Sequence, residues 1–181
     1  MTKKTIAIIG ATGDMGSAIA KSLAKGNYRL LLFAEDRKSL SSLAEEIRKT
    51  NPSADIDCMG CAADASWEAD IIIPAVPSCA QREMAEKIEP YANRKIVISI
   101  PDSLSETNNN LIISTGTNAA EELQRLLPGA KVVSASNALS AANFFQPVNE
   151  DNQNNVFIAE EEEVLKTVAE TIKTMDSVQQ N

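Results

Sequence analysis

Three glycines near the N-terminus have the spacing of a phosphate-binding loop. Gly10, Gly13 and Gly16 form a G-x-x-G-x-x-G pattern between an apolar run and a stretch of helical periodicity. In such a loop the first glycine makes a tight turn, the second lets the backbone approach a pyrophosphate, and the third lets helix and strand pack closely. The free N–H groups at the helix start then face the phosphates. The pattern predicts a dinucleotide site, with Thr12 as a hydroxyl donor; a glycine-rich turn or a site for another phosphate is the alternative.

Charged residues follow at the distance where a ribose is expected. An acid about 20 residues beyond the glycines accepts hydrogen bonds from the ribose hydroxyls of NAD and repels the 2′-phosphate of NADP. Glu35 and Asp36 stand there, but Arg37 and Lys38 follow at once and would have the opposite effect. The acids come first, so residue chemistry leans weakly towards NAD.

Other chemistry-bearing patterns are weaker. Histidine is absent, which excludes Ser-His-Asp and Cys-His hydrolysis. Cys58 and Cys61 form a C-x-x-C at the end of an expected strand with no clear helix after it, so we expect two ordinary thiols and no metal site. Tyr91 and Lys95 match the YxxxK of short-chain dehydrogenases. Pro90 and the strand expected at Lys95 would keep the two side chains off a shared helix face.

The elements that must position these residues alternate between strand and helix, as in βαβ units. The expected strands are Thr5–Ile9, Leu30–Phe33, Ala54–Met59, Asp70–Val76, Lys95–Ile100, Lys131–Ala135 and Val156–Ala159. The expected helices are Asp14–Ala24, Ser39–Lys49, Gln81–Ile88, Ala119–Leu127 and Glu160–Met175. Trp67, among nearby alanines, is expected to pack between strands. The expected fold class is α/β: one doubly wound, mostly parallel Rossmann sheet over residues 1–181, with helices on both faces and the ligand at the carboxyl ends of the strands.

The bulk composition limits the partners. The chain has 181 residues and a net charge of −8, which argues against nucleic acid or an anionic membrane as a partner. No segment approaches the length of a transmembrane helix, and the first apolar stretch is too short for a signal peptide, so a cytoplasmic location is expected.

Three segments together carry a resemblance. Residues 10–16, 69–77 and 127–139 resemble, in order, the deazaflavin-dependent NADP oxidoreductase family (coenzyme F-420-dependent type), whose nucleotide domain is also similar to that of pyrroline-5-carboxylate reductase. The likeness runs from about residue 4 to about residue 174, and the third segment is the most specific. In this family hydride passes directly between stacked rings, so no protein acid or base is obligatory and no catalytic residue is assigned.

The resemblance implies a role for each matched segment. Thr12, Gly13, Asp14 and Met15 would touch the pyrophosphate, and Glu35, Asp36 and Arg37 would surround the adenosine ribose. Ala75, Val76 and Pro77 would line the adenine side. The nicotinamide side would be formed by Ile100, Pro101, Asn137, Ala138 and Leu139. NADP is the cofactor that the resemblance implies.

Two departures from the family matter. Glu35 and Asp36 stand where basic or hydroxyl residues usually meet the 2′-phosphate. The C-terminal segment that covers the second substrate in longer relatives is expected to be absent, and the need to cover the nicotinamide cleft from water favours a homodimer. Three interpretations stay open: an NAD(P)-dependent oxidoreductase acting on a flavin-like or small carbonyl or imine acceptor, an NAD(P)-binding or redox-sensing module without turnover, and a short-chain dehydrogenase-like reductase.

Overall fold

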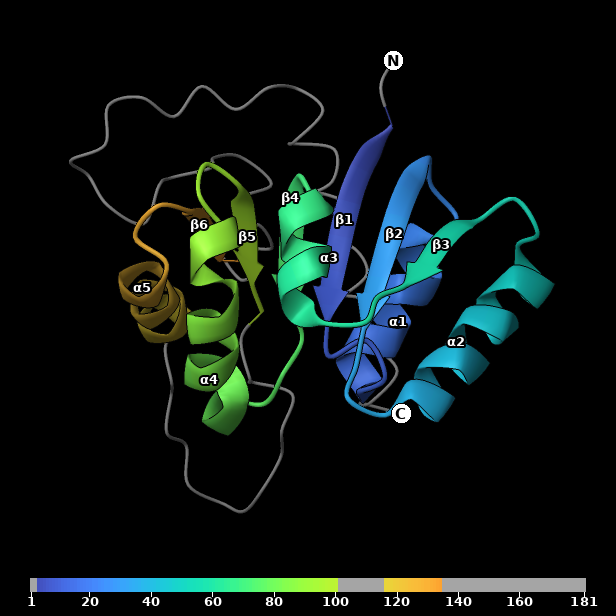
Figure 1. The fold of residues 1–181 in the computed structure, drawn as a ribbon, viewed down its shortest axis with the longest axis horizontal. Helices are drawn as coiled ribbons and strands as arrows, with labels where there is room; N and C mark the ends of the chain where they lie inside the picture. Colours follow the sequence, from blue (N-terminus) through green and yellow to red (C-terminus); the bar gives the residue numbers. More distant parts are fainter. Residues whose placement is uncertain (1–2, 101–115, 135–181) are drawn as a thin grey trace.

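The computed structural model describes residues 3–100 and 116–134 and contains a six-stranded sheet with the order β3-β2-β1-β4-β5-β6 (Figure 1). Every adjacent pair of these strands is parallel. The strands are β1 (Lys4–Ile9), β2 (Tyr28–Phe33), β3 (Asp55–Cys58), β4 (Ile71–Pro74), β5 (Ile96–Ser99) and β6 (Lys131–Ser134). The helices are α1 (Asp14–Leu23), α2 (Arg37–Thr50), α3 (Ala62–Glu68), α4 (Ser78–Ile88), the 3₁₀ turn η1 (Glu89–Tyr91) and α5 (Gly116–Leu126). The strand order reverses between β1 and β4, so the doubly wound Rossmann sheet predicted from the sequence is confirmed.

Helices cover both faces of the sheet because its strands are apolar on both faces. Alternate side chains of the central strands, such as Ile6 and Ile8, pack with α1 and α2 in one buried cluster. The intervening side chains, such as Ala7 and Ile9, pack with α3, α4 and α5 in a second cluster. Figure 1 shows α3 and α4 in front of the sheet and α1 behind it. The rigid centre of the sheet therefore fixes the carboxyl ends of β1, β2 and β4, where the phosphate loop lies.

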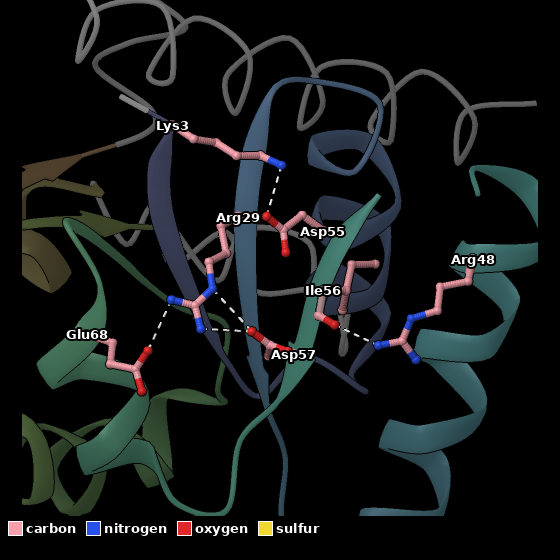
Figure 2. Close-up of polar contacts among 7 residues, drawn as sticks. All are labelled: Lys3, Arg29, Arg48, Asp55, Ile56, Asp57 and Glu68. Atoms are coloured by element: carbon pink, nitrogen blue, oxygen red, sulfur yellow. Dashed lines mark hydrogen bonds and ion pairs between the residues drawn. The ribbon is translucent and has the colours of Figure 1, made fainter. Parts of the chain in front are cut away.

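Polar contacts hold the edge strand β3 against β2 (Figure 2). Arg29 of β2 donates to Asp57 of β3 at 2.8 Å and lies 3.1 Å from the carboxylate of Glu68 at the end of α3. The hydrogen bond to Asp57 and the charge of both carboxylates raise the pKa of Arg29. On the other side of β3, Arg48 of α2 donates to the carbonyl oxygen of Ile56 at 2.6 Å. These contacts fix the strand whose end leads into the loop at Gly60.

The sequence missed one helix, and its prediction for one side chain was wrong. Helix α3 begins directly after Cys61, although no helix was expected there. Its buried residues are small, Ala62, Ala65 and Ser66, so the segment lacks the large apolar stripe by which a helix is recognised. Trp67 does not pack between strands: it lies on the outer side of α3 and is 68% exposed.

Two predicted elements lie outside the described residues, namely the strand Val156–Ala159 and the helix Glu160–Met175. Among residues 3–100 and 116–134 the structure has no helix that is long and apolar enough to cross a membrane.

Candidate functional site

The phosphate loop, residues 10–16, lies where three parallel strands end. The backbone N–H groups of Gly10 and Ala11 both donate to the carbonyl oxygen of Phe33, the last residue of β2, at 2.8 and 2.9 Å. On the opposite side, the N–H of Ala75 donates to the carbonyl oxygen of Ile9 at 2.7 Å. The loop is thus fixed between the ends of β2 and β4, at the point where the strand order reverses and where open α/β sheets bind their ligands.

Two of the three glycines are required by the protein's own packing. Gly10 has φ +87°, and a Cβ there would lie 2.5 Å from the carbonyl oxygen of Ala75. A Cβ on Gly16 would lie 2.3 Å from the carbonyl oxygen of Gly10. Both distances are shorter than real Cβ contacts. The tight turn and the close approach of helix to strand, which the sequence predicted for these two positions, are therefore both present.

Gly13 differs from the other two glycines. Its φ of −67° and ψ of 165° are open to any residue, and a Cβ there would meet nothing closer than 3.5 Å. That Cβ would lie 3.5 Å from the carbonyl oxygen of Gly10 and 3.9 Å from that of Ala75, both ordinary contact distances. Gly13 is exposed and is the N-cap of α1, without a side-chain cap. The fold therefore does not require a glycine at this position. A pyrophosphate that approaches the backbone of the loop from outside would require one, because a side chain would stand in its way.

The remaining residues expected at the pyrophosphate differ in how far their side chains are exposed. Thr12 is half-buried, Asp14 is exposed, and Met15 is partly buried against the α1 side of the core. Met15 therefore has only its backbone to offer a phosphate.

The segment between β2 and α2 gives its two acids different roles. The carboxylate of Asp36 is the N-cap of α2: it accepts from the backbone N–H of Lys38 at 3.0 Å and from the Ser39 hydroxyl at 2.6 Å. Hydrogen bonds from the Ser39 hydroxyl, and next from the backbone N–H groups of Lys38 and Ser39, lower the pKa of Asp36. Glu35 is exposed. Of the two acids expected at the ribose, only Glu35 has a carboxylate that is not already used within the cap.

Arg37 contacts the loop that follows β3. Its guanidinium donates to the carbonyl oxygen of Gly60 at 3.2 Å, in the loop that follows β3. It therefore joins the loops after β2 and β3, on the outer side of the site.

The segment after β4 lies next to the phosphate loop, as predicted. Ala75 and Val76 are half-buried, and a Cβ on Gly10 would meet both of them. Pro77 is exposed and is the N-cap of α4. Ile100 follows β5 and is half-buried against the core. Pro101, Asn137, Ala138 and Leu139 lie outside the described residues.

A groove beside the phosphate loop contains residues that the sequence did not bring together. It lies between α1 and α2, has a volume of about 390 Å³, and begins at Thr12 of the loop. We call it the α1–α2 groove; it is lined by Thr12, Ser17, Lys21, Lys38, Ser39, Ser42, Leu43 and Glu46. From the sequence, Lys38 was expected only to counteract the preference for NAD that Glu35 and Asp36 would give. No periodic pattern pairs it with Thr12, because the two are brought together by the packing of α2 beside α1.

Comparison with known proteins identifies the family. The sequence profile of the family described as NADP oxidoreductase, coenzyme F420-dependent, matches residues 5–103. The chain belongs to this family. The resemblance stated from the sequence is thereby confirmed, and the family is one of nicotinamide-dependent oxidoreductases.

Individual known proteins are similar to this chain over different shares of their length. An F420-dependent NADP reductase of Methanocaldococcus jannaschii is 29% identical, over 96% of this chain and 80% of that protein. A glycerol-3-phosphate dehydrogenase [NAD(P)+] of Thioalkalivibrio sulfidiphilus is 26% identical, but the alignment spans 75% of this chain and about half (47%) of that protein. The solved structure of a candidate F420-dependent NADP reductase from Arthrobacter is similar in fold, with a TM-score of 0.54, 22% identity, and coverage of 71% of this chain and 60% of that one.

The two cysteines of the C-x-x-C, Cys58 and Cys61, make separate contacts in the described structure. The Sγ of Cys61 accepts from the N–H of Asp64 at 3.4 Å as the N-cap of α3, whereas the Cys58 thiol lies 3.9 Å from the carbonyl oxygen of Leu40 in α2. The thiols are free, and burial raises the pKa of Cys58. The expectation that no helix follows the motif was wrong. In the described part of the chain, no three His, Cys, Asp or Glu side chains are grouped to hold a metal.

Tyr91 and Lys95 do not form a catalytic pair in the described structure. Tyr91 ends the 3₁₀ turn η1, and Lys95 lies in the connection that leads into β5. The ammonium of Lys95 donates to the carbonyl oxygen of Ser66 at 2.5 Å and also to that of Trp67. Burial lowers the pKa of Lys95. Lys95 therefore stabilises the end of α3, and the two residues share no helix face, as the sequence predicted.

Proposed function

We propose that this chain binds NADP(H) across the carboxyl edge of its sheet and transfers hydride between the nicotinamide and a deazaflavin-like or flavin-like acceptor. The observation that carries the proposal is the phosphate loop at the reversal of strand order. There, Gly10 and Gly16 are required by the fold, whereas the exposed Gly13 is not, and a pyrophosphate that approaches the loop would account for it. Membership in an oxidoreductase family supports the same conclusion.

The described residues fit a dinucleotide. Because α1 begins at Asp14 without a side-chain cap, the N–H groups of its first turn remain available to a pyrophosphate. Ala75 and Val76 would bound the adenine side, since they already contact the loop at Gly10. Ile100 would bound the nicotinamide side together with Pro101 and residues 137–139, as the resemblance implies.

The protein's part in this reaction is to bind and orient. The nicotinamide supplies the hydride, and the chain has no histidine to serve as a general acid or base. The residues at the strand ends would hold two rings in contact and keep water away from them. Such positioning lowers the barrier by fixing the reacting atoms near their reactive distance.

A deazaflavin-like acceptor is preferred because of how the relatives align. The reductase relative matches this chain through 96% of its length and is itself covered to 80%, whereas the glycerol-3-phosphate dehydrogenase is covered to 47%. Small carbonyl or imine acceptors are the alternative. A homodimer would supply the cover that an open nicotinamide cleft needs; light scattering that shows a monomer with the cofactor bound would contradict the dimer.

The test is a calorimetric titration of the purified chain with NADPH and with NADH, followed by turnover assays. The acceptors are a 5-deazaflavin, FMN and dihydroxyacetone phosphate. Saturable NADPH binding with deazaflavin reduction supports the proposal. Saturable binding without turnover on any acceptor would point instead to a binding module, and absence of binding at millimolar dinucleotide would refute the proposed site.

A further inference from the structure

Trp67 is a large apolar side chain that the fold does not bury. Helix α3 packs on the sheet through the small side chains of Ala62, Ala65 and Ser66. The indole of Trp67 lies on the outer side of the helix and is 68% exposed. Exposing so much apolar surface to water is unfavourable. Tryptophan is among the residue types that dominate the binding energy of interfaces, so its exposure here indicates a contact surface.

A second exposed aromatic residue lies on the neighbouring element. The turn η1 packs against α3 and ends at Tyr91, which is 39% exposed. The ammonium of Lys95 donates to the carbonyl oxygens of Ser66 and Trp67 at the end of α3. The backbone N–H of Lys95 donates to the carbonyl oxygen of Ala92, directly after η1, at 3.1 Å. The two aromatic residues are therefore held on a fixed backbone, which lowers the entropic cost of binding to them.

Carboxylates without ion-pair partners accompany the two aromatic residues. Asp64 stands three positions before Trp67, and therefore on the same side of α3, and Glu89 begins η1. Both acids are exposed, and neither makes an ion pair within the part of the chain that the structure describes. Arg94 is an exposed cation close by in the sequence, but the two acids outnumber it, and the whole chain has a net charge of −8. We call Asp64, Trp67, Glu89 and Tyr91 the α3–η1 surface; its charge favours a basic partner.

The α3–η1 surface lies away from the dinucleotide site. Helix α3 leads from the carboxyl end of β3 back to the start of β4, so Trp67 in its last turn lies towards the amino edge of the sheet (Figure 1). The turn η1 follows α4, which also runs back from the carboxyl edge, and leads into β5. The phosphate loop lies at the opposite, carboxyl edge. A partner on the α3–η1 surface would therefore leave the dinucleotide site open.

We propose that the α3–η1 surface docks a basic protein segment, with an arginine side chain stacked on the indole of Trp67. A guanidinium is planar and is attracted to the face of an aromatic ring, most strongly to that of tryptophan. Further basic side chains of the segment pair with Asp64 and Glu89, and Tyr91 adds apolar contact area. A second copy of this chain fits less well, because a symmetric contact brings the same unpaired acids together. The inference does not depend on the proposed function.

Fluorescence tests the docking directly, because Trp67 is the one tryptophan of the chain. The purified full chain is titrated with an arginine-rich peptide and with a matched peptide in which glutamate replaces every arginine. We expect a saturable change in the emission of Trp67 with the arginine-rich peptide and no change with the glutamate peptide. Because the contact is partly electrostatic, the affinity should fall as the salt concentration is raised.

Calorimetric titration of variants identifies the residues that bind the arginine-rich peptide. Trp67→Ala should weaken binding about tenfold or more, as expected for an aromatic anchor of an interface. Asp64→Asn should weaken it roughly two- to fivefold, the range for an exposed ion pair. The matched control is Glu45→Gln, which removes the same charge from an exposed position of α2, on the other face of the sheet, and should change nothing. Because Trp67 is exposed, the melting temperature of Trp67→Ala should equal that of the wild type.

The proposal is overturned if the arginine-rich peptide leaves the emission of Trp67 unchanged, or if Trp67→Ala binds the peptide like the wild type. Equal effects of Asp64→Asn and Glu45→Gln would also overturn it, because the attraction would then come from net charge alone. If the emission of the free chain changes with protein concentration while light scattering shows a dimer, a second copy covers the surface and the proposal fails. NADPH binding should be the same in Trp67→Ala and the wild type, so each of these outcomes is distinct from a failure of the proposed dinucleotide site.

Discussion

The clearest prediction separates the glycine that serves the ligand from the glycine that serves the fold. In Gly16→Ala the new Cβ would lie 2.3 Å from the carbonyl oxygen of Gly10, whereas real Cβ contacts keep at least 3.0 Å. The helix and the loop must therefore separate by about 0.7 Å. Overpacking of this kind costs about 1–3 kcal/mol. At about 2–4 °C for each kcal/mol in a chain of this size, the melting temperature should fall by roughly 2–12 °C.

Gly13→Ser should have the opposite profile. The position accepts any residue by its φ and ψ, the nearest atom to the new Cβ is 3.5 Å away, and serine is a better N-cap than glycine. Stability should therefore stay within about 0.5 kcal/mol of the wild type or rise slightly. NADPH affinity should fall about tenfold or more, because the new side chain would keep the pyrophosphate away from the backbone of the loop.

The assay is thermal unfolding of both variants without cofactor, followed by titration of each with NADPH. Gly13→Ala serves as a second variant without the added hydroxyl, in case that hydroxyl itself binds phosphate. A Gly13→Ser variant that binds NADPH like the wild type would refute the assignment of Gly13 to the ligand. A Gly16→Ala variant with unchanged stability would refute the account of the loop packing.

Further predictions follow from other contacts. Asp36→Ala should lower the melting temperature on the order of a few degrees by removing the cap of α2. Because the pKa of Asp36 is lowered in the folded state, its contribution to stability is complete above the ordinary pKa of a carboxyl group and is lost as the pH falls through the lowered value. The melting temperatures of the wild type and the variant should therefore converge in acid. Lys95→Met should lower the free energy of unfolding by about 1 kcal/mol in a urea titration, because two carbonyl oxygens at the end of α3 lose their donor. Tyr91→Phe should leave turnover unchanged. A loss of turnover in Tyr91→Phe without a loss of stability would favour the short-chain dehydrogenase interpretation instead. Cys58 should react with a thiol reagent more slowly than Cys79 near neutral pH, because burial raises the pKa of Cys58; equal rates in single-cysteine variants would contradict this.

The sequence predicted the sheet well because the sheet is determined by local pattern. Runs such as Ile71–Pro74 are apolar on both faces, and in a chain that alternates strand and helix such runs have one stable arrangement, a parallel sheet between two layers. The phosphate loop was equally predictable, because three glycines at this spacing between a strand and a helix form a local pattern. The contacts behind the pattern differ in range: Gly16 meets Gly10 within the loop, whereas Gly10 meets Ala75 after β4. Element ends shifted by only a few residues, as where α2 begins at Arg37 instead of Ser39.

The features that escaped prediction depend on contacts between distant segments. Helix α3 buries small side chains and exposes its tryptophan, so its pattern is the reverse of what a hydrophobic face predicts. The α1–α2 groove likewise has no signature in the chain, because Thr12 and Lys38 stand 26 positions apart and meet through the packing of two helices.

The acid at position 36 shows why spacing alone cannot decide between NAD and NADP. A carboxylate just after the second strand can accept from a ribose, but it can equally accept from the first N–H groups of the helix that follows. In this chain Ser39 and the N–H of Lys38 already occupy both oxygens of Asp36. A carboxylate held in this way is oriented by the helix start, and its charge is partly balanced by the helix N-terminus. The lean towards NAD then depends mainly on Glu35, whose carboxylate is not part of the cap. Whether an acid at this spacing is available to a ribose therefore depends on whether the cap of the following helix has already engaged it, and spacing along the chain does not show that.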